Sequence, residues 1–180
     1  MYLMKNCCFF GHRRLFNKED IRNRLYTFVE TLIQRGYKNF LIGTHGEFDN
    51  VSLSVCRELR KKYHIKITIV FTSVAKLSKP KNSDVSDADL YNDCETLIYD
   101  IEEVFYKNQI TISNQKMIDN SDYVICYVDE TKSPSGAKKA MKYAVKHNKE
   151  ISNLFLESDN PTYSMTNQEK NEFWKNLLNN

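Results

Sequence analysis

Short apolar runs alternate with amphipathic stretches along most of the chain. Each run is flanked by glycine or polar residues, a pattern typical of strands that are buried on both faces of a sheet. Strands are therefore predicted over Lys5–Phe10, Asn39–Gly43, Ile65–Thr72, Asp122–Val128 and Ile151–Leu156.

The stretches between these runs carry apolar residues at helical spacing. Asn17 is a suitable N-cap for a first helix, which Gly36 ends in the C′ position. Asp49 or Asn50 is expected to cap a second helix. A third is predicted by an apolar stripe at helical spacing, formed by Ala137, Ala140, Met141, Ala144 and Val145. Less regular patterns predict a helix over 95–102, a strand over 103–106 and the end of a small helix at 117–120.

This alternation predicts an α/β fold: a single Rossmann-like domain with three α/β/α layers, in which helices cover both faces of an open parallel sheet. The domain is expected over residues 1–156, with right-handed crossovers. Residues 157–180 form a C-terminal appendage, in which Thr166 and Glu169 match the capping box of a helix. The apolar face of that helix is expected to pack on the domain, and contact with a partner is the alternative.

A polar segment over residues 73–94 interrupts the alternation. Loops of this length are often lids or binding loops. The carboxylates in the segment raise the question of a metal site, but their spacing matches no calcium-binding loop. A solvated loop without metal is favoured; its acidic residues include Asp84, Asp87, Asp89 and Asp93.

Composition limits the classes of function. The 26 basic and 23 acidic residues nearly balance, which gives no support to nucleic-acid binding. No apolar run approaches the roughly 20 residues that span a bilayer, so no membrane partner is expected. The five cysteines form no CxxC pair, so neither a zinc site nor a redox motif is predicted, and a cytoplasmic location without cofactor is expected.

The residues that follow the strands are the candidates for chemistry, because ligands of open parallel sheets bind beyond the carboxyl ends of the strands. Three such segments combine small and hydrogen-bonding residues, namely Gly11–Arg14, Gly43–Asp49 and Ser133–Lys138. Glycines let backbone N–H groups approach a ligand, and the helix that follows each segment adds partial positive charge. Together the three segments predict a cradle for a phosphate or another polyoxygen group.

Each of these residues also has an ordinary structural explanation. Gly11 suits a simple turn, Asp49 suits a helix cap, and His12 and His45 are equally typical of polar loops. The Gly43-x-x-Gly46 spacing matches neither the P-loop nor the GxGxxG fingerprint of dinucleotide-binding folds.

Several motifs nevertheless occur in a recognisable order: CCFFGHR at 7–13, GTHGEFD at 43–49, N-x-x-M at 114–117, SDYVICYV at 121–128 and SGAKKAMKYA at 135–144. In this combination the chain resembles the SLOG superfamily of Rossmann-like proteins, which includes the LOG and DprA/Smf proteins, and most closely its YpsA-like branch. The resemblance spans roughly residues 5–156 and implies a three-layer α/β/α domain that binds a nucleotide-derived ligand.

The resemblance also implies functions and binding residues. LOG relatives are phosphoribohydrolases, whereas other SLOG domains are thought to sense nucleotide signals, including ADP-ribose derivatives in anti-phage systems. A homo-oligomer, a dimer or higher, is expected by the same analogy. The expected ligand-binding residues, from the motifs and their neighbours, are Gly11, His12, Arg13, Gly43, Thr44, His45, Gly46, Phe48, Asp49, Asn114, Ser135, Gly136, Ala137 and Lys138.

The chain departs from the family patterns at instructive positions. The LOG signature PGGxGTxxE, laid from Pro134, places Lys142 where the glutamate should be. Cleavage of a ribosyl bond passes through a cationic transition state, which a carboxylate stabilises and a lysine opposes. Glu47, Asp49 and His45, together with His12, are therefore only weak candidates for catalysis.

Three hypotheses follow for the function. The first is a binding module that senses or sequesters a phosphate-bearing nucleotide derivative. The second is an enzyme that cleaves an N-glycosidic or phosphate bond. The third is a protein-interaction domain that uses the helix of residues 157–180 as its contact.

Overall fold

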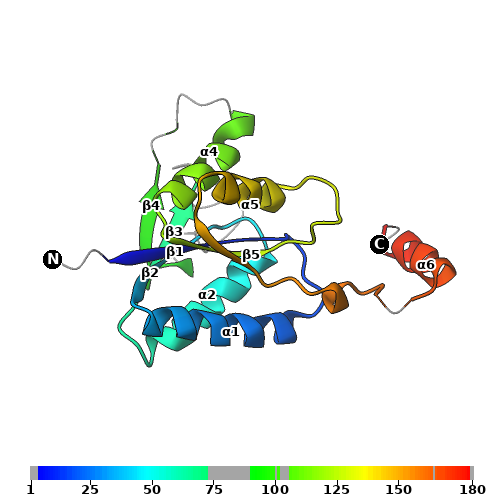
Figure 1. The fold of residues 1–180 in the computed structure, drawn as a ribbon, viewed down its shortest axis with the longest axis horizontal. Helices are drawn as coiled ribbons and strands as arrows, with labels where there is room; N and C mark the ends of the chain where they lie inside the picture. Colours follow the sequence, from blue (N-terminus) through cyan, green and yellow to red (C-terminus); the bar gives the residue numbers. More distant parts are fainter. Residues whose placement is uncertain (1–3, 73–89, 100, 102–105, 164, 179–180) are drawn as a thin grey trace.

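The computed structural model describes residues 4–72, 90–99, 101, 106–163 and 165–178 (Figure 1). Within these residues, six parallel strands form a single sheet in the order β4-β3-β2-β1-β5-β6. The strands are β1 (Lys5–Gly11), β2 (Tyr37–Ile42), β3 (Lys66–Phe71), β4 (Glu95–Ile98), β5 (Tyr123–Tyr127) and β6 (Glu150–Asn153). The five predicted strands and the α/β class are confirmed.

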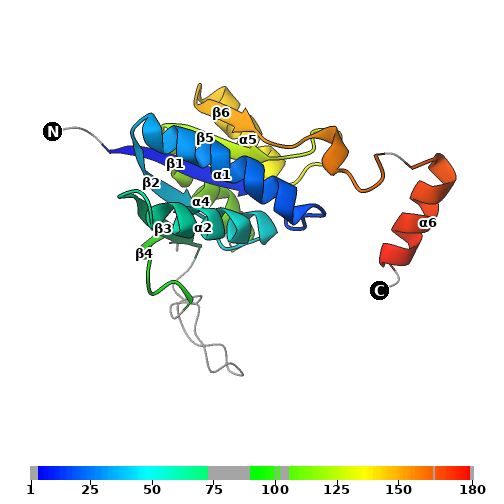
Figure 2. The ribbon, with the colours of Figure 1, turned by 90° about the horizontal axis from the view of Figure 1, so that it is seen from below.

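Helices cover both faces of the sheet, as Figures 1 and 2 show. Helices α1 (Lys18–Gln34) and α2 (Glu47–Arg60) pack on one face, and α4 (Tyr106–Asp119) and α5 (Gly136–Lys146) pack on the other. Adjacent residues of β1 therefore point into different layers: Phe9 joins the core under α1 and α2, and Phe10 joins the core under α4 and α5. This is the predicted three-layer α/β/α architecture.

Strand β1 lies between two halves of the sheet that the chain builds in opposite directions. From β1 the chain adds β2, β3 and β4 on one side, and it then adds β5 and β6 on the other. The loops that leave β1 and β5 diverge at this switch point, where open α/β sheets bind their ligands.

The first helix follows the prediction and the second begins earlier. Helix α1 has Asn17 as its N-cap, and Gly36 takes the left-handed conformation after its last turn, with φ of 92°. Helix α2 begins at Glu47 with Gly46 as N-cap, so the expectation that Asp49 or Asn50 is the N-cap is wrong. Asp49 still caps the helix, but from inside its first turn, because its carboxylate accepts two backbone N–H groups.

The expected helix over 95–102 is wrong, because β4 begins at Glu95. Leu97 packs on the α4/α5 core and Ile98 on the α1/α2 core, which is the two-residue alternation of a strand. The predicted strand over 103–106 and the carboxylates Asp84, Asp87 and Asp89 lie largely or wholly outside the described residues. The helix end predicted at 117–120 is confirmed by α4.

Asp93, the fourth acidic residue of the polar segment, forms ion pairs with Arg57 and Arg60 of α2. These guanidinium groups hold the pKa of the Asp93 carboxyl well below its usual range. Asp93 therefore fastens the start of β4 to α2.

The C-terminal segment leaves β6 through a short 3-10 helix, η2 (Glu157–Asp159), and ends in α6 (Asn167–Leu178). Arg24 of α1 binds both carboxylate oxygens of buried Asp159 at 2.7 Å, which fastens η2 to the domain. Thr166 and Glu169 form the predicted capping box of α6. Figures 1 and 2 show α6 beyond the end of the sheet, where Phe173 contacts Phe16 with ring centroids 6.4 Å apart. No described helix has the length and apolar character needed to cross a membrane.

Candidate functional site

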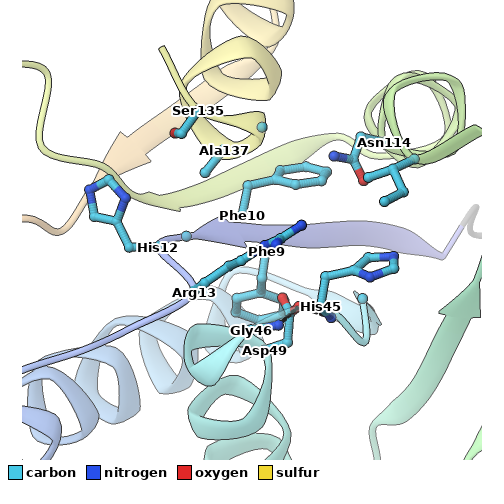
Figure 3. Close-up of a pocket in the computed structure, with 14 residues that line it drawn as sticks. Phe9, Phe10, His12, Arg13, His45, Gly46, Asp49, Asn114, Ser135 and Ala137 are labelled. Carbon is cyan, nitrogen blue, oxygen red and sulfur yellow. Dashed lines mark hydrogen bonds between the residues drawn. The ribbon is translucent and has the colours of Figure 1, made fainter. Parts of the chain in front are cut away.

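A cavity of about 410 Å³ opens at the carboxyl edge of the sheet, at the switch point beside β1 (Figure 3). Segments that are distant in sequence form its wall: the end of β1, the loop after β2, the middle of α4 and the start of α5. The lining residues are Phe9, Phe10, Gly11, His12, Arg13, Gly43, His45, Gly46, Asp49, Ile110, Asn114, Ser135, Gly136 and Ala137. The structure thus brings together residues from all three loop segments that the sequence singled out.

Two glycines allow the loop after β1 to lie directly on α2. A Cβ atom on Gly11 would come within 2.3 Å of the Phe48 ring, and one on Gly46 would come within 2.9 Å of Arg13 Cα. The N–H of Glu47 donates to the carbonyl of Arg13 at 3.0 Å and holds the two segments together. The glycines are therefore required by the close packing of β1 and its following loop on α2.

Asp49 provides the carboxylate of the cavity. Its Oδ2 accepts the N–H groups of His45 at 2.8 Å and Gly46 at 3.1 Å, the two residues that precede α2. Burial raises the pKa of Asp49 to about 6, although these two hydrogen bonds act in the opposite direction. The N-terminus of α2 is thus already occupied by a carboxylate of its own chain.

Arg13 is the cation of the cavity. Its side chain is exposed, and in Figure 3 it extends across β1 toward the side of the cavity that holds Asn114. None of the described residues pairs with its guanidinium group. An uncommitted guanidinium at a cavity wall is well suited to bind a phosphate or carboxylate with two parallel hydrogen bonds.

The start of α5 faces the same cavity and remains open. Ser135 is its N-cap and accepts the N–H of Lys138 at 3.1 Å. A Cβ atom on Gly136 would meet nothing within 4 Å, so the first turn is accessible from the cavity. The partial positive charge of this helix end adds to that of Arg13.

Three expected binding residues do not line the cavity. Phe48 is completely buried beneath Gly11, where its ring stacks on Tyr127. Thr44 lies in the β2 loop, and its buried hydroxyl has no partner among the described residues. The ammonium group of Lys138 donates to the carbonyls of Glu130 and Lys132, and this holds it on the loop before α5.

His12 borders the cavity, but Figure 3 shows its imidazole turned away from the other labelled side chains. Its Nε2 accepts the backbone N–H of Asp129 at 2.7 Å, which requires an unprotonated Nε2. Partial burial and the charge of Lys132 lower the pKa of His12. His12 therefore positions the loop between β5 and α5.

The remaining acid–base candidates differ in position. Glu47 lies beside the cavity wall, where it accepts the N–H of Leu15 and pairs with Lys18, so its carboxylate is committed outside the cavity. His45 lines the cavity, and its backbone N–H contributes to the cap of Asp49. Lys142, which stands in place of the LOG glutamate, is exposed on α5 and does not line the cavity. Among the described residues, no group of three or more metal-ligating side chains is present.

Sequence reasoning missed the apolar part of the wall. Phe9, Phe10 and Ile110 line the cavity beside Asn114. The two phenylalanines lie near the carboxyl end of a buried strand, and this position could have indicated that they line a ligand site. Flat aromatic and aliphatic groups are suited to contact the rings of a small molecule.

Comparison with known proteins agrees with this architecture. A family model described as the YspA SLOG family matches residues 7–158. The chain belongs to the YspA SLOG family. The match covers the sheet except for the first two residues of β1, together with every lining residue of the cavity, so the resemblance drawn from the motifs is confirmed. The search of curated proteins returned no match. Membership of this SLOG family links the fold to nucleotide-related ligands.

Proposed function

We propose that this SLOG protein binds a phosphate-bearing nucleotide derivative, such as an ADP-ribose-type molecule, and senses or sequesters it. One observation carries the proposal: an unpaired guanidinium and an open helix N-terminus face the same cavity at the switch point of a parallel sheet. Both features favour an anion, and the volume of about 410 Å³ is in the range of small-molecule sites.

The lining residues suggest how such a ligand lies. A phosphate is placed at Gly136, between the start of α5 and Arg13, because the start of α2 is closed by Asp49. Phe10 and Ile110 offer apolar contact for a base, and the Asn114 amide offers both a donor and an acceptor to its edge. Asp49 lies across the cavity and accepts hydroxyl groups of a ribose.

Calorimetric titration with nucleoside monophosphates, ADP-ribose and cyclic ADP-ribose tests the proposal. We expect at least one of them to bind, and we expect Arg13→Gln to weaken that binding about tenfold or more, since a charge-assisted phosphate contact is lost. Arg14→Gln is the matched control, because Arg14 is the adjacent exposed arginine and does not line the cavity. Failure of every compound to bind or to raise the melting temperature contradicts the proposal, as does equal weakening by both substitutions.

An N-glycosidase is the second candidate, and the raised pKa of Asp49 favours it. A carboxyl that titrates near pH 6 inside a cavity is able to act as an acid or a base near neutral pH. Chromatographic detection of a free base from nucleoside monophosphates or NAD, and its loss in Asp49→Asn, supports this activity. Binding without any product supports the binding module.

A further inference from the structure

A second, smaller hollow continues from the cavity between α4 and α5. It measures about 50 Å³, and its wall consists of Ile110, Thr111, Asn114, Gln115, Gly136, Lys139, Ala140 and Tyr143. Ile110, Asn114 and Gly136 also line the main cavity, so the two spaces meet at the first turn of α5. A Cβ atom on Gly136 would have no neighbour within 4 Å, which leaves the passage between them open.

The polar side chains of this crevice are predominantly hydrogen-bond donors or neutral groups, and no carboxylate lines it. The Thr111 hydroxyl, the Gln115 amide and the Lys139 ammonium group all lack a side-chain partner among the described residues. Tyr143 is already committed, because its hydroxyl donates to Asp119 at 3.1 Å. The crevice therefore offers uncommitted donors and one positive charge at its rim.

Size limits what this crevice can hold. A water molecule takes up about 30 Å³ in the liquid, so a space of about 50 Å³ accommodates a few heavy atoms and excludes a nucleobase. A phosphate group meets both the size and the charge of the crevice. Lys138 is turned to backbone carbonyls, and Lys142 does not line either space, so Lys139 is the lysine that serves it.

On the basis of the proposed function, we infer that the ligand carries a diphosphate, with one phosphate at Gly136 and Arg13 and the next in the α4–α5 crevice at Lys139. Adjacent phosphates fit the arrangement because the crevice begins at Gly136, where the first phosphate is placed. The substrate class is thus a nucleoside diphosphate or a molecule linked through a diphosphate.

Titration calorimetry with AMP and ADP tests this inference, since the two probes differ by one phosphate. We expect the wild-type protein to bind ADP about five- to tenfold more tightly than AMP, which is the range for one charge-assisted contact at an exposed rim. Lys139→Gln should abolish this preference and leave AMP binding unchanged. Lys142→Gln, an exposed lysine on the same helix, should retain it.

Other outcomes separate this inference from the proposed function. Equal binding of AMP and ADP by the wild-type protein, or a preference that survives Lys139→Gln, overturns the diphosphate subsite and leaves nucleotide binding intact. Equal weakening of both probes by Lys139→Gln also overturns it, because Lys139 then serves the first phosphate. Thr111→Val is a second variant, which removes a hydroxyl that lines the crevice but not the main cavity, and it should weaken ADP more than AMP. Absence of binding by any nucleotide, including ADP-ribose, contradicts the proposed function itself.

Discussion

Replacement of Gly11 by alanine tests the close packing that builds the cavity wall. Gly11 has no positive φ, so alanine is compatible with the backbone conformation there. The added methyl group would lie 2.3 Å from Phe48 Cγ, 2.4 Å from Cδ1 and 2.6 Å from Cβ. The contact with Cβ matters most, because rotation of the Phe48 ring cannot move that atom away from the methyl group.

The magnitude follows from what has to move. Phe48 is completely buried, and its ring stacks on Tyr127 with centroids 5.5 Å apart, so relief requires a shift of α2 against β1. Overpacking of a core typically costs about 1–3 kcal/mol, and we expect Gly11→Ala to lie at the upper end, near 3 kcal/mol. For a chain of this length that corresponds to a melting temperature lower by roughly 6–12 °C.

Urea denaturation followed by circular dichroism measures this loss. Gly136→Ala is the matched control, because its methyl group meets nothing within 4 Å, and we expect it to stay within about 1 kcal/mol of the wild type. In a Phe48→Ala background the additional cost of Gly11→Ala should fall by about 1 kcal/mol or more, since the contacts with Cγ and Cδ1 are gone and the emptied core lets the remaining Cβ atom give way. A Gly11→Ala protein as stable as the wild type, or one equally destabilised in both backgrounds, refutes the packing argument.

Three further predictions concern charged groups. Burial raises the pKa of Asp49 from 3.8 to about 6, so its ionisation should lower the free energy of unfolding by up to about 3 kcal/mol as pH rises from 4 to 6. Urea titrations of Asp49→Asn should lack this dependence on pH. An unchanged dependence in that variant contradicts the role given to Asp49. Partial burial lowers the pKa of His12, so its effect has the opposite sign, and stability should fall as pH drops below the ordinary histidine value of about 6.5. His12→Ala costs about 1–2 kcal/mol at pH 8 through the lost acceptor for the Asp129 N–H, and it should lack that step. Removal of the Arg24 partner in Asp159→Ala should speed hydrogen exchange over residues 154–162 while β1 stays protected, and uniform exchange argues against a local fastening.

Much of the fold could be predicted because the central strands are apolar on both faces. Ile65–Thr72 and Asp122–Val128 have no alternative as amphipathic helices, and the parallel topology then places their following loops at one edge. Strand β4 escaped prediction because it is a partly exposed edge strand, in which Glu95 and Thr96 dilute the apolar signal. Its identity depends on pairing with β3, a contact that local sequence does not contain.

The candidate site could be predicted in its location but not in the direction of each side chain. Phe48 and Asp49 are neighbours on α2, yet one enters the core and the other lines the cavity, because the helix begins at Glu47. With a helix that starts at Asp49 or Asn50, Phe48 and Asp49 would lie before the helix or at its cap, and the directions of their side chains could not be read from helical spacing. Lys138 was expected in the cavity wall, but its ammonium group donates to the backbone carbonyls of Glu130 and Lys132 instead, and local sequence does not reveal such contacts.

The two helix N-termini at this edge differ in a way that orients any anionic ligand. At α2, the carboxylate of Asp49 and the carbonyl of Arg13 take up the first backbone N–H groups. At α5, Ser135 caps from outside and Gly136 leaves the first turn accessible. An anion at α2 would have to displace a carboxylate that also stabilises the helix, whereas an anion at α5 meets partial positive charge and Arg13. Negative charge is therefore drawn to the α5 side, and this leaves Asp49 facing the uncharged part of the ligand.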